Sequence, residues 1–173
     1  MIKVYDKNRN LKDLEWLIQE FGPIRITGEG GWKVIALQEE IGPANINIYL
    51  YDKSGNLAEH VPVLWCDPQH KYEEHTNELG RVGFALGGGS YYRPPDQGPN
   101  WVTVDGGENS ETIKGLGMIG RSTHRHLNVV FQYFEPSAPE PPLPPPPDDC
   151  DDYLSALEEI RDIIDDVFLN SQE

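Results

Sequence analysis

The sequence predicts a mainly β protein in which two antiparallel sheets pack face to face as a sandwich. In several short runs hydrophobic and polar residues alternate, which is the period-two pattern of strands with one buried face. Segments rich in glycine, proline, asparagine and aspartate separate these runs and predict turns between the strands. The chain has 173 residues, of which 38% are hydrophobic, enough for one domain of ordinary size with appendages.

Residues 1–23 predict a short strand followed by a short helix. Residues 1–5 alternate as a strand does, and Asn10 is the expected N-cap of the helix, with Asp13 three residues later. Gly22 is the expected C-terminal stop. The apolar residues of the helix have the spacing of one buried face: Leu14, Leu17, Ile18 and Phe21. Because so short a helix is marginal alone, we expect it to cover an edge or an open end of the sandwich.

Residues 24–135 predict the sandwich itself. The clearest strands lie between residues 44 and 86, where three sets of alternating apolar residues flank a turn around Gly55. These sets are Ile46, Ile48 and Leu50; Val61, Val63 and Trp65; and Val82, Phe84 and Leu86. Further strands are expected over residues 24–27, 32–37, 101–104 and 122–134, the last one in the centre of a sheet because both of its faces are partly apolar. Residues 67–77 and 87–100 are polar or rich in glycine and proline and are expected to be loops.

The composition changes abruptly after Glu135, which marks the predicted end of the body. Residues 136–147, PSAPEPPLPPPP, predict a semi-rigid polyproline II spacer. Residues 148–173 predict an acidic amphipathic helix with apolar residues at heptad spacing: Tyr153, Leu157, Ile160, Ile164 and Val167. We interpret these five residues as an oligomerisation surface. The helix is too short to be stable alone, so it is expected to pair with a second copy, with a partner protein or with its own body.

Charge excludes several classes of partner. The chain has a net charge of −15, which argues against binding nucleic acid or anionic membranes through its general surface. No apolar run is long enough to span a membrane, and the N-terminal stretch has no apolar core of a signal peptide. We therefore expect a cytoplasmic protein or a component of a virus-like assembly, unless it is exported by a route that the sequence does not reveal. The two cysteines, Cys66 and Cys150, are too few for a disulfide framework.

One candidate binding site is an aromatic loop and the strand after it. Tyr91, Tyr92, Arg93 and Trp101 lie beside a triple glycine and two prolines. Aromatic rings give a large contact area at low entropic cost, so these residues are candidates for stacking on a carbohydrate or holding a protein surface. The alternative is that the rings pack over one end of the sandwich. The triple glycine is not followed by the residues of a phosphate-binding loop, so no nucleotide is expected.

A second candidate is a pair of histidines in the last predicted strand. His124 and His126 alternate and would point to the same face of the sheet, which suits two ligands of one metal ion. The sequence nominates no third ligand, and two such histidines also fit an ordinary hydrogen-bonded sheet surface. No nucleophile motif is present, so we expect no cofactor and a protein that is not an enzyme.

Two segments of the predicted sandwich resemble those of a known family. Asp52, Gly55 and Val61-Pro62-Val63, followed by Thr76, Gly80 and Phe84, resemble the transthyretin-like and carboxypeptidase-regulatory-like β-sandwiches. The resemblance covers about 45 residues, Ala44 to Leu86. It implies an immunoglobulin-like or prealbumin-like sandwich of seven strands, used as a rigid accessory or adhesion domain that is usually not catalytic. It implies no particular binding residue.

The sequence thus supports three functional hypotheses. The first is an interaction module that binds a carbohydrate or a protein surface through the aromatic loop and oligomerises or docks through its C-terminal helix. The second is a structural subunit of a phage-like or other large assembly. The third is a metal-dependent enzyme that uses His124 and His126.

Overall fold

The computed structural model of the chain describes residues 1–42, 45–86, 91–92, 98–107, 109–119 and 125–135. The predicted proline-rich spacer, the predicted C-terminal helix, Arg93 and His124 lie outside these residues. All the described elements belong to one compact unit, Met1–Pro136.

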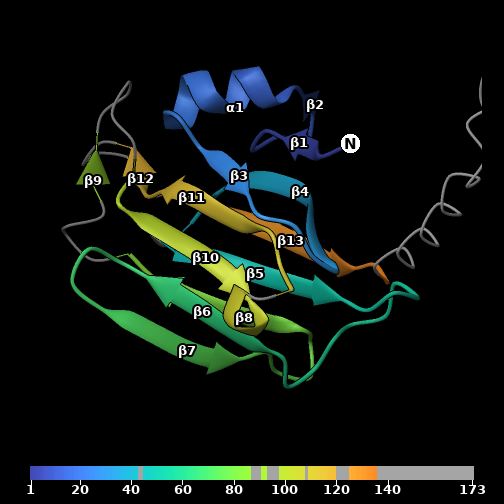
Figure 1. Cartoon of the computed structure of the whole chain (residues 1–173). Coiled ribbons are helices and arrows are strands. Elements are labelled where there is room, and N and C mark those ends of the chain that lie inside the picture. The colour runs from blue at the N-terminus through green and yellow to red at the C-terminus, as the bar shows by residue number, and fades with distance from the viewer. Residues whose placement is uncertain (43–44, 87–90, 93–97, 108, 120–124, 136–173) are drawn as a thin grey trace, which may run out of the picture. The chain divides into compact units, whose positions relative to one another are not determined.

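Two sheets stack to form the predicted β sandwich (Figure 1). The six-stranded sheet has the order β2 (Leu11–Lys12), β1 (Lys3–Tyr5), β4 (Trp32–Ile41), β13 (Arg125–Tyr133), β5 (Asn45–Tyr51) and β8 (Arg81–Ala85). The five-stranded sheet has the order β3 (Arg25–Thr27), β11 (Thr112–Leu116), β10 (Asn100–Val104), β6 (Pro62–Cys66) and β7 (Lys71–His75). A small parallel pair joins β9 (Tyr91–Tyr92) to β12 (Met118–Ile119). The mainly β prediction is confirmed.

Strand β13 lies at the centre of the six-stranded sheet, as its two partly apolar faces predict. It pairs antiparallel with β4 and parallel with β5, so two strands that are consecutive in sequence are separated in space by β13. A buried amide pair joins the parallel strands: Asn47 Nδ2 donates to Asn128 Oδ1 at 2.9 Å, and Arg81 Nη2 donates to Asn47 Oδ1 at 2.8 Å. Because Asn47 and Asn128 are register partners, a slip of one residue would leave both amides buried without each other.

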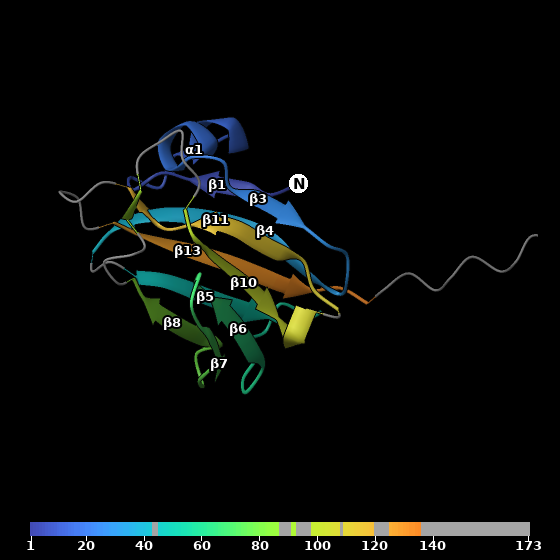
Figure 2. The ribbon, with the colours of Figure 1, turned by 60° about the vertical axis from the view of Figure 1, so that its left-hand side comes forward.

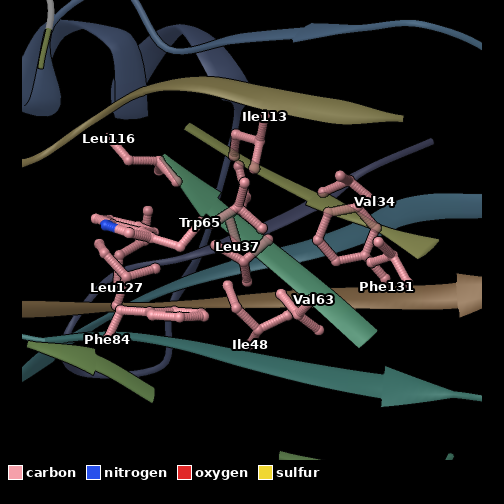
Figure 3. Packing of buried hydrophobic residues seen from close by; sticks show 14 of the residues in the cluster. Val34, Leu37, Ile48, Val63, Trp65, Phe84, Ile113, Leu116, Leu127 and Phe131 are labelled. Carbon is pink, nitrogen blue, oxygen red and sulfur yellow. The ribbon is translucent and has the colours of Figure 1, made fainter. Parts of the chain in front are cut away.

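The core lies between the two sheets. Figure 3 shows side chains of both sheets packed together, with Val63, Trp65, Ile113 and Leu116 facing Ile48, Phe84, Leu127 and Phe131. The strand residues that the alternation predicts to be inward are buried, among them Ile46, Val63, Phe84 and Phe131. The two-sheet interior expected from the sequence is therefore present.

Helix α1 spans Leu14–Phe21 and lies beside β1 and β3 at one side of the sandwich (Figures 1 and 2). The predicted N-cap, Asn10, is wrong: Asp13 caps the helix and accepts a hydrogen bond from the Trp16 N–H at 2.7 Å. Asn10 instead closes a turn with Asp6. Of the predicted apolar stripe, Leu17 and Phe21 are buried, whereas Leu14 and Ile18 stay partly exposed.

The strands differ from the prediction in several places. Residues 87–100, predicted as a loop, contain β9, and the short strands β2 and β12 were not predicted. Residues 67–77, predicted as a loop, contain β7, in which every residue is exposed, so no alternation marks it. Strand β11 was not predicted because Lys114 and Gly115 interrupt its apolar pattern. In β4 a bulge shifts the pairing register with β13 between Val34 and Leu37. Both of these residues are buried although they are three positions apart, so the predicted strict alternation is wrong there.

The same five-residue turn occurs at residues 6–10 and 52–56. In each, the first residue is an aspartate whose Oδ1 accepts the N–H groups of the third and fifth residues at 2.8 or 2.9 Å. The fourth residue has a positive φ, 64° at Arg9 and 83° at Gly55. Residues 77–81 form a third version with an asparagine in first position and Gly80 in the fourth. The fourth residue is thus glycine in two of the turns and arginine in the first, and the backbone of Arg9 is strained at this positive φ.

We expect Arg9→Gly to stabilise the protein by about 0.5 kcal/mol, because glycine adopts this positive φ without steric cost while adding flexibility to the unfolded chain. Urea denaturation followed by tryptophan fluorescence measures the effect. Lys7→Gly in the same turn is the control, since Lys7 does not have a positive φ, and it should destabilise. Equal effects of the two substitutions would contradict the strain argument.

Candidate functional site

The aromatic site predicted from the sequence is only partly placed by the structure. Tyr91 and Tyr92 form β9, and their side chains lie outside the described residues, as does the whole of Arg93. Trp101 is half-buried in β10, where it pairs with Cys66 and Lys114 and lines a hollow of about 530 Å³ on the five-stranded sheet. Among the described residues no second aromatic side chain lines this hollow. Stacking by the predicted aromatic set stays a prediction.

The predicted metal site is likewise only partly described. His126 lies in β13 with Glu40 as its register partner, and its side chain lies outside the described set. Within the described residues no three or more histidine, cysteine, aspartate or glutamate side chains gather to hold a metal ion. Cys66 is buried, and this burial raises the pKa of its thiol. In the described part of the chain no helix is long and apolar enough to cross a membrane.

A larger cleft lies where the edge strands of the two sheets face each other. Strand β7 ends the five-stranded sheet and β8 ends the six-stranded sheet, and both lie on the side of the sandwich away from α1 (Figures 1 and 2). The cleft between them, here called the edge cleft, has a volume of about 820 Å³. Its lining residues come from β6, β7, β8, the β6–β7 turn and the start of β10: Trp65, Asp67, Pro68, Gln69, His70, Tyr72, Glu74, Gly83, Phe84, Ala85 and Asn100.

The floor of the edge cleft is a stacked aromatic pair. The rings of Trp65 and Phe84 lie 5.2 Å apart between centroids, with an interplanar angle of 12°. Both are buried, one from each sheet, because strand alternation directs them inward. This pair closes the cleft against the core and leaves an apolar base under the polar rim.

One wall is built by β7 and the turn before it. Tyr72 is the register partner of Trp65 and Glu74 that of Val63, so both point to the inner side of their sheet. Both side chains stay accessible nonetheless: every residue of β7 is exposed, and 46% of Tyr72 is exposed to solvent. The His70 ring lies 5.7 Å from that of Tyr72, which gives this wall two adjacent rings.

Asp67 fixes the turn that places His70. Its Oδ1 accepts hydrogen bonds from the backbone N–H groups of Gln69 and His70, both at 2.7 Å, and lies 3.3 Å from His70 Nδ1. The bond from Gln69 and then that from His70 hold the pKa of the Asp67 carboxyl below its ordinary value. This carboxylate is therefore ionised at neutral pH, and its Oδ1 accepts the hydrogen bonds that hold the turn in this wall.

The opposite wall is the free edge of β8. Gly83 and Ala85 line it, so small side chains leave backbone groups accessible along that strand. The lining residues that the structure describes include two carboxylates, Asp67 and Glu74, and neither lysine nor arginine. The cleft is thus polar, acidic and open between two strand edges.

Comparisons with protein-family models, with curated proteins and with solved structures find no match to this chain.

Sequence reasoning missed the edge cleft because the sequence does not show which strands lie at the edges of the two sheets. Tyr72 and His70 lie in the stretch 67–77 that was predicted to be a loop, and Phe84 looked like an ordinary core residue. The sequence carries no signal for this strand, because residues 71–75, KYEEH, hold one aromatic ring among charged or polar side chains without apolar–polar alternation.

Proposed function

We propose that the protein is a non-catalytic binding module that holds a neutral carbohydrate in the edge cleft. The main supporting observation is the combination of an exposed tyrosine ring, hydrogen-bonding side chains and an apolar floor in one cleft of about 820 Å³. Pockets for small ligands typically measure roughly 300–1,000 Å³. A short oligosaccharide matches this size.

The chemistry of the lining suits a sugar. A sugar ring presents an apolar C–H face that stacks on an aromatic ring, and Tyr72 offers such a ring beside His70. Sugar hydroxyl groups both donate and accept hydrogen bonds, and Glu74, Gln69 and the edge of β8 supply acceptors and donors. The two carboxylates and the overall charge of −15 favour a neutral sugar over a phosphorylated or acidic one.

Binding without catalysis is supported by the state of one of the two carboxylates in the cleft, Asp67. Glycoside hydrolysis requires one carboxyl group that donates a proton. Asp67 has a lowered pKa and its Oδ1 is held by two backbone N–H groups, so it is poorly suited to give up a proton near neutral pH. A rigid accessory role also agrees with the finer fold that we propose, an immunoglobulin-like or prealbumin-like sandwich related to the transthyretin-like family.

The test is binding of purified protein to an array of neutral oligosaccharides, namely β-glucans, xylans, mannans, galactans and N-acetylglucosamine oligomers, followed by calorimetry on each hit. We expect at least one hit with a change in tryptophan fluorescence, because Trp65 lies at the cleft floor. The proposal fails if no member of the set binds at millimolar concentration, or if the hit is bound equally well when the cleft is altered.

We expect Tyr72→Ala to weaken binding of that oligosaccharide roughly two- to twelvefold, since loss of one stacked ring is worth roughly 0.5–1.5 kcal/mol. The melting temperature should change little because the side chain is exposed. Calorimetric titration measures the affinity. Phe134→Ala is the matched control: its ring is similarly exposed, at 42%, but does not line the edge cleft, so its affinity should equal that of the unmodified chain.

A further inference from the structure

A second hollow, here called the end groove, lies where the described body ends. It has a volume of about 460 Å³ and is lined from β4, β13, the turn after β5 and the segment before β6. Its lining residues are Trp32, Asp52, Lys53, Ser54, Ala58, Val61, Tyr133 and Glu135. None of these lines the edge cleft, so the two hollows are separate.

Two aromatic rings form the apolar part of the end groove. Trp32 and Tyr133 are register partners on neighbouring strands, and their rings meet edge to face with centroids 5.3 Å apart. Gly31 has no side chain, which leaves room for the Tyr133 ring against the backbone there. Tyr133 and Val61 are half-buried and lie beside the buried Trp32 and Ala58, so the groove has an apolar base that exposes mainly the Tyr133 ring and Val61.

Charged groups form the rim. Lys53 and Glu135 make an exposed ion pair, and their mutual hydrogen bond raises the pKa of Lys53 and lowers that of Glu135. The pair holds Glu135 at the wall of the groove, directly before the proline-rich residues 136–147. An aromatic groove with a polar rim is the type of surface on which proline-rich peptides dock in the polyproline II conformation.

We propose that the end groove binds the proline-rich segment 136–147 of a second copy of this chain. The segment contains eight prolines in twelve residues, PSAPEPPLPPPP, so its conformational freedom is already low and little entropy is lost on binding. Its one apolar non-proline side chain larger than alanine, Leu143, provides an anchor for the apolar base of the groove.

The choice of a second copy follows from where the segment starts. Glu135 is itself part of the groove wall, so the segment begins at the site rather than at a distance from it. In the polyproline II conformation a chain advances roughly 3 Å per residue, so the middle of the segment would not return to the groove at which the segment begins. A segment from another chain is not limited in this way.

Such binding would link copies head to tail. The groove of one chain and the segment of the next are different surfaces, so the contact generates a reciprocal dimer, a larger ring or an open chain. A larger ring or an open chain would support the second hypothesis, that the protein is a subunit of a larger assembly, and the contact does not depend on carbohydrate binding in the edge cleft.

The experiment combines sedimentation and NMR on the full chain with a synthetic peptide of residues 136–147 as the probe. We expect the chain to associate as its concentration rises, and excess peptide to reverse this association while shifting the Trp32 indole and Tyr133 ring signals. A full-length variant with serine in place of the prolines at 141, 142 and 144–147 keeps residues 148–173 and should lose the association.

Ser54→Trp fills the groove from an exposed turn position and should weaken peptide binding tenfold or more. Asn8→Trp is its matched control, because Asn8 occupies the same place in the equivalent turn and does not line the groove. The proposal is overturned if association persists in the serine variant, since residues 148–173 would then cause it, or if the peptide leaves the Trp32 and Tyr133 signals unchanged. It is also overturned if these signals differ between the unmodified chain and the serine variant under conditions where both are monomeric, because that result means docking within one chain.

Discussion

Replacing Phe131 by alanine is expected to lower the free energy of unfolding by about 4 kcal/mol. Phe131 lies in β13, at the centre of the six-stranded sheet, and its side chain is fully buried. The substitution removes a large apolar side chain and leaves a cavity that neighbours in two sheets cannot fill without moving both. Since domains of this size are commonly stable by only about 5–15 kcal/mol, much of the population should unfold at moderate temperature. Urea denaturation monitored by circular dichroism measures the loss.

Phe134→Ala is the matched control for this prediction. It makes the same chemical change three residues later, where 42% of the side chain is exposed, and should alter stability by no more than about 0.5 kcal/mol. Similar losses at the two positions would show that β13 is not the centre of a shared interior, and the description of the fold would then be wrong.

The second large effect is expected from Gly30→Ala, about 3 kcal/mol of destabilisation. A Cβ atom at residue 30 would lie 2.2 Å from the carbonyl carbon of Asn109 and 2.3 Å from the nitrogen of Ser110. These are backbone atoms and cannot move aside as a flexible side chain can. Here the segment before β4 is tied to the segment before β11: the Gly31 N–H donates to Asn109 Oδ1 at 2.6 Å and the Trp32 N–H to the Asn109 carbonyl at 3.1 Å. A displacement would therefore disturb the connection between the two sheets.

Gly55→Ala separates steric overlap from backbone strain. Gly55 has a φ of 83°, but nothing lies within 4 Å of the position that a Cβ atom would occupy. Its substitution should cost only about 1 kcal/mol, the price of a left-handed conformation for an L-residue. Thermal unfolding of both variants gives the comparison, and a loss at Gly30 no larger than that at Gly55 would contradict the close approach of the two segments.

The strands that were predictable from the sequence are those with one buried face and one polar face. In β5, β6 and β8 every second residue enters the core, so the alternation is visible in the sequence. Strand β7 escaped prediction because an edge strand with both faces exposed has no such contrast. The N-cap of α1 was misplaced because Asn10 and Asp13 are both good capping residues, and only the turn around Asp6 decides between them.

The edge cleft was not predictable because its geometry depends on which strands end each sheet. Trp65 and Phe84 are 19 positions apart, and their stacking requires that β6 and β8 belong to opposite sheets. Pairing order is a long-range property, whereas sequence patterns report on local structure. Tyr72 was therefore visible only as one aromatic residue among charges, and the aromatic loop 91–93 attracted the prediction instead.

The place of β13 also determines when the body can be completed during synthesis. In the six-stranded sheet, β13 is the only element that connects the half containing β1 and β4 with the half containing β5 and β8, and it is the last strand to leave the ribosome among the described elements. Until then the facing edges of β4 and β5 stay unpaired and able to pair with other nascent chains. Translation stalled before residue 125 should thus yield a product that chaperones retain.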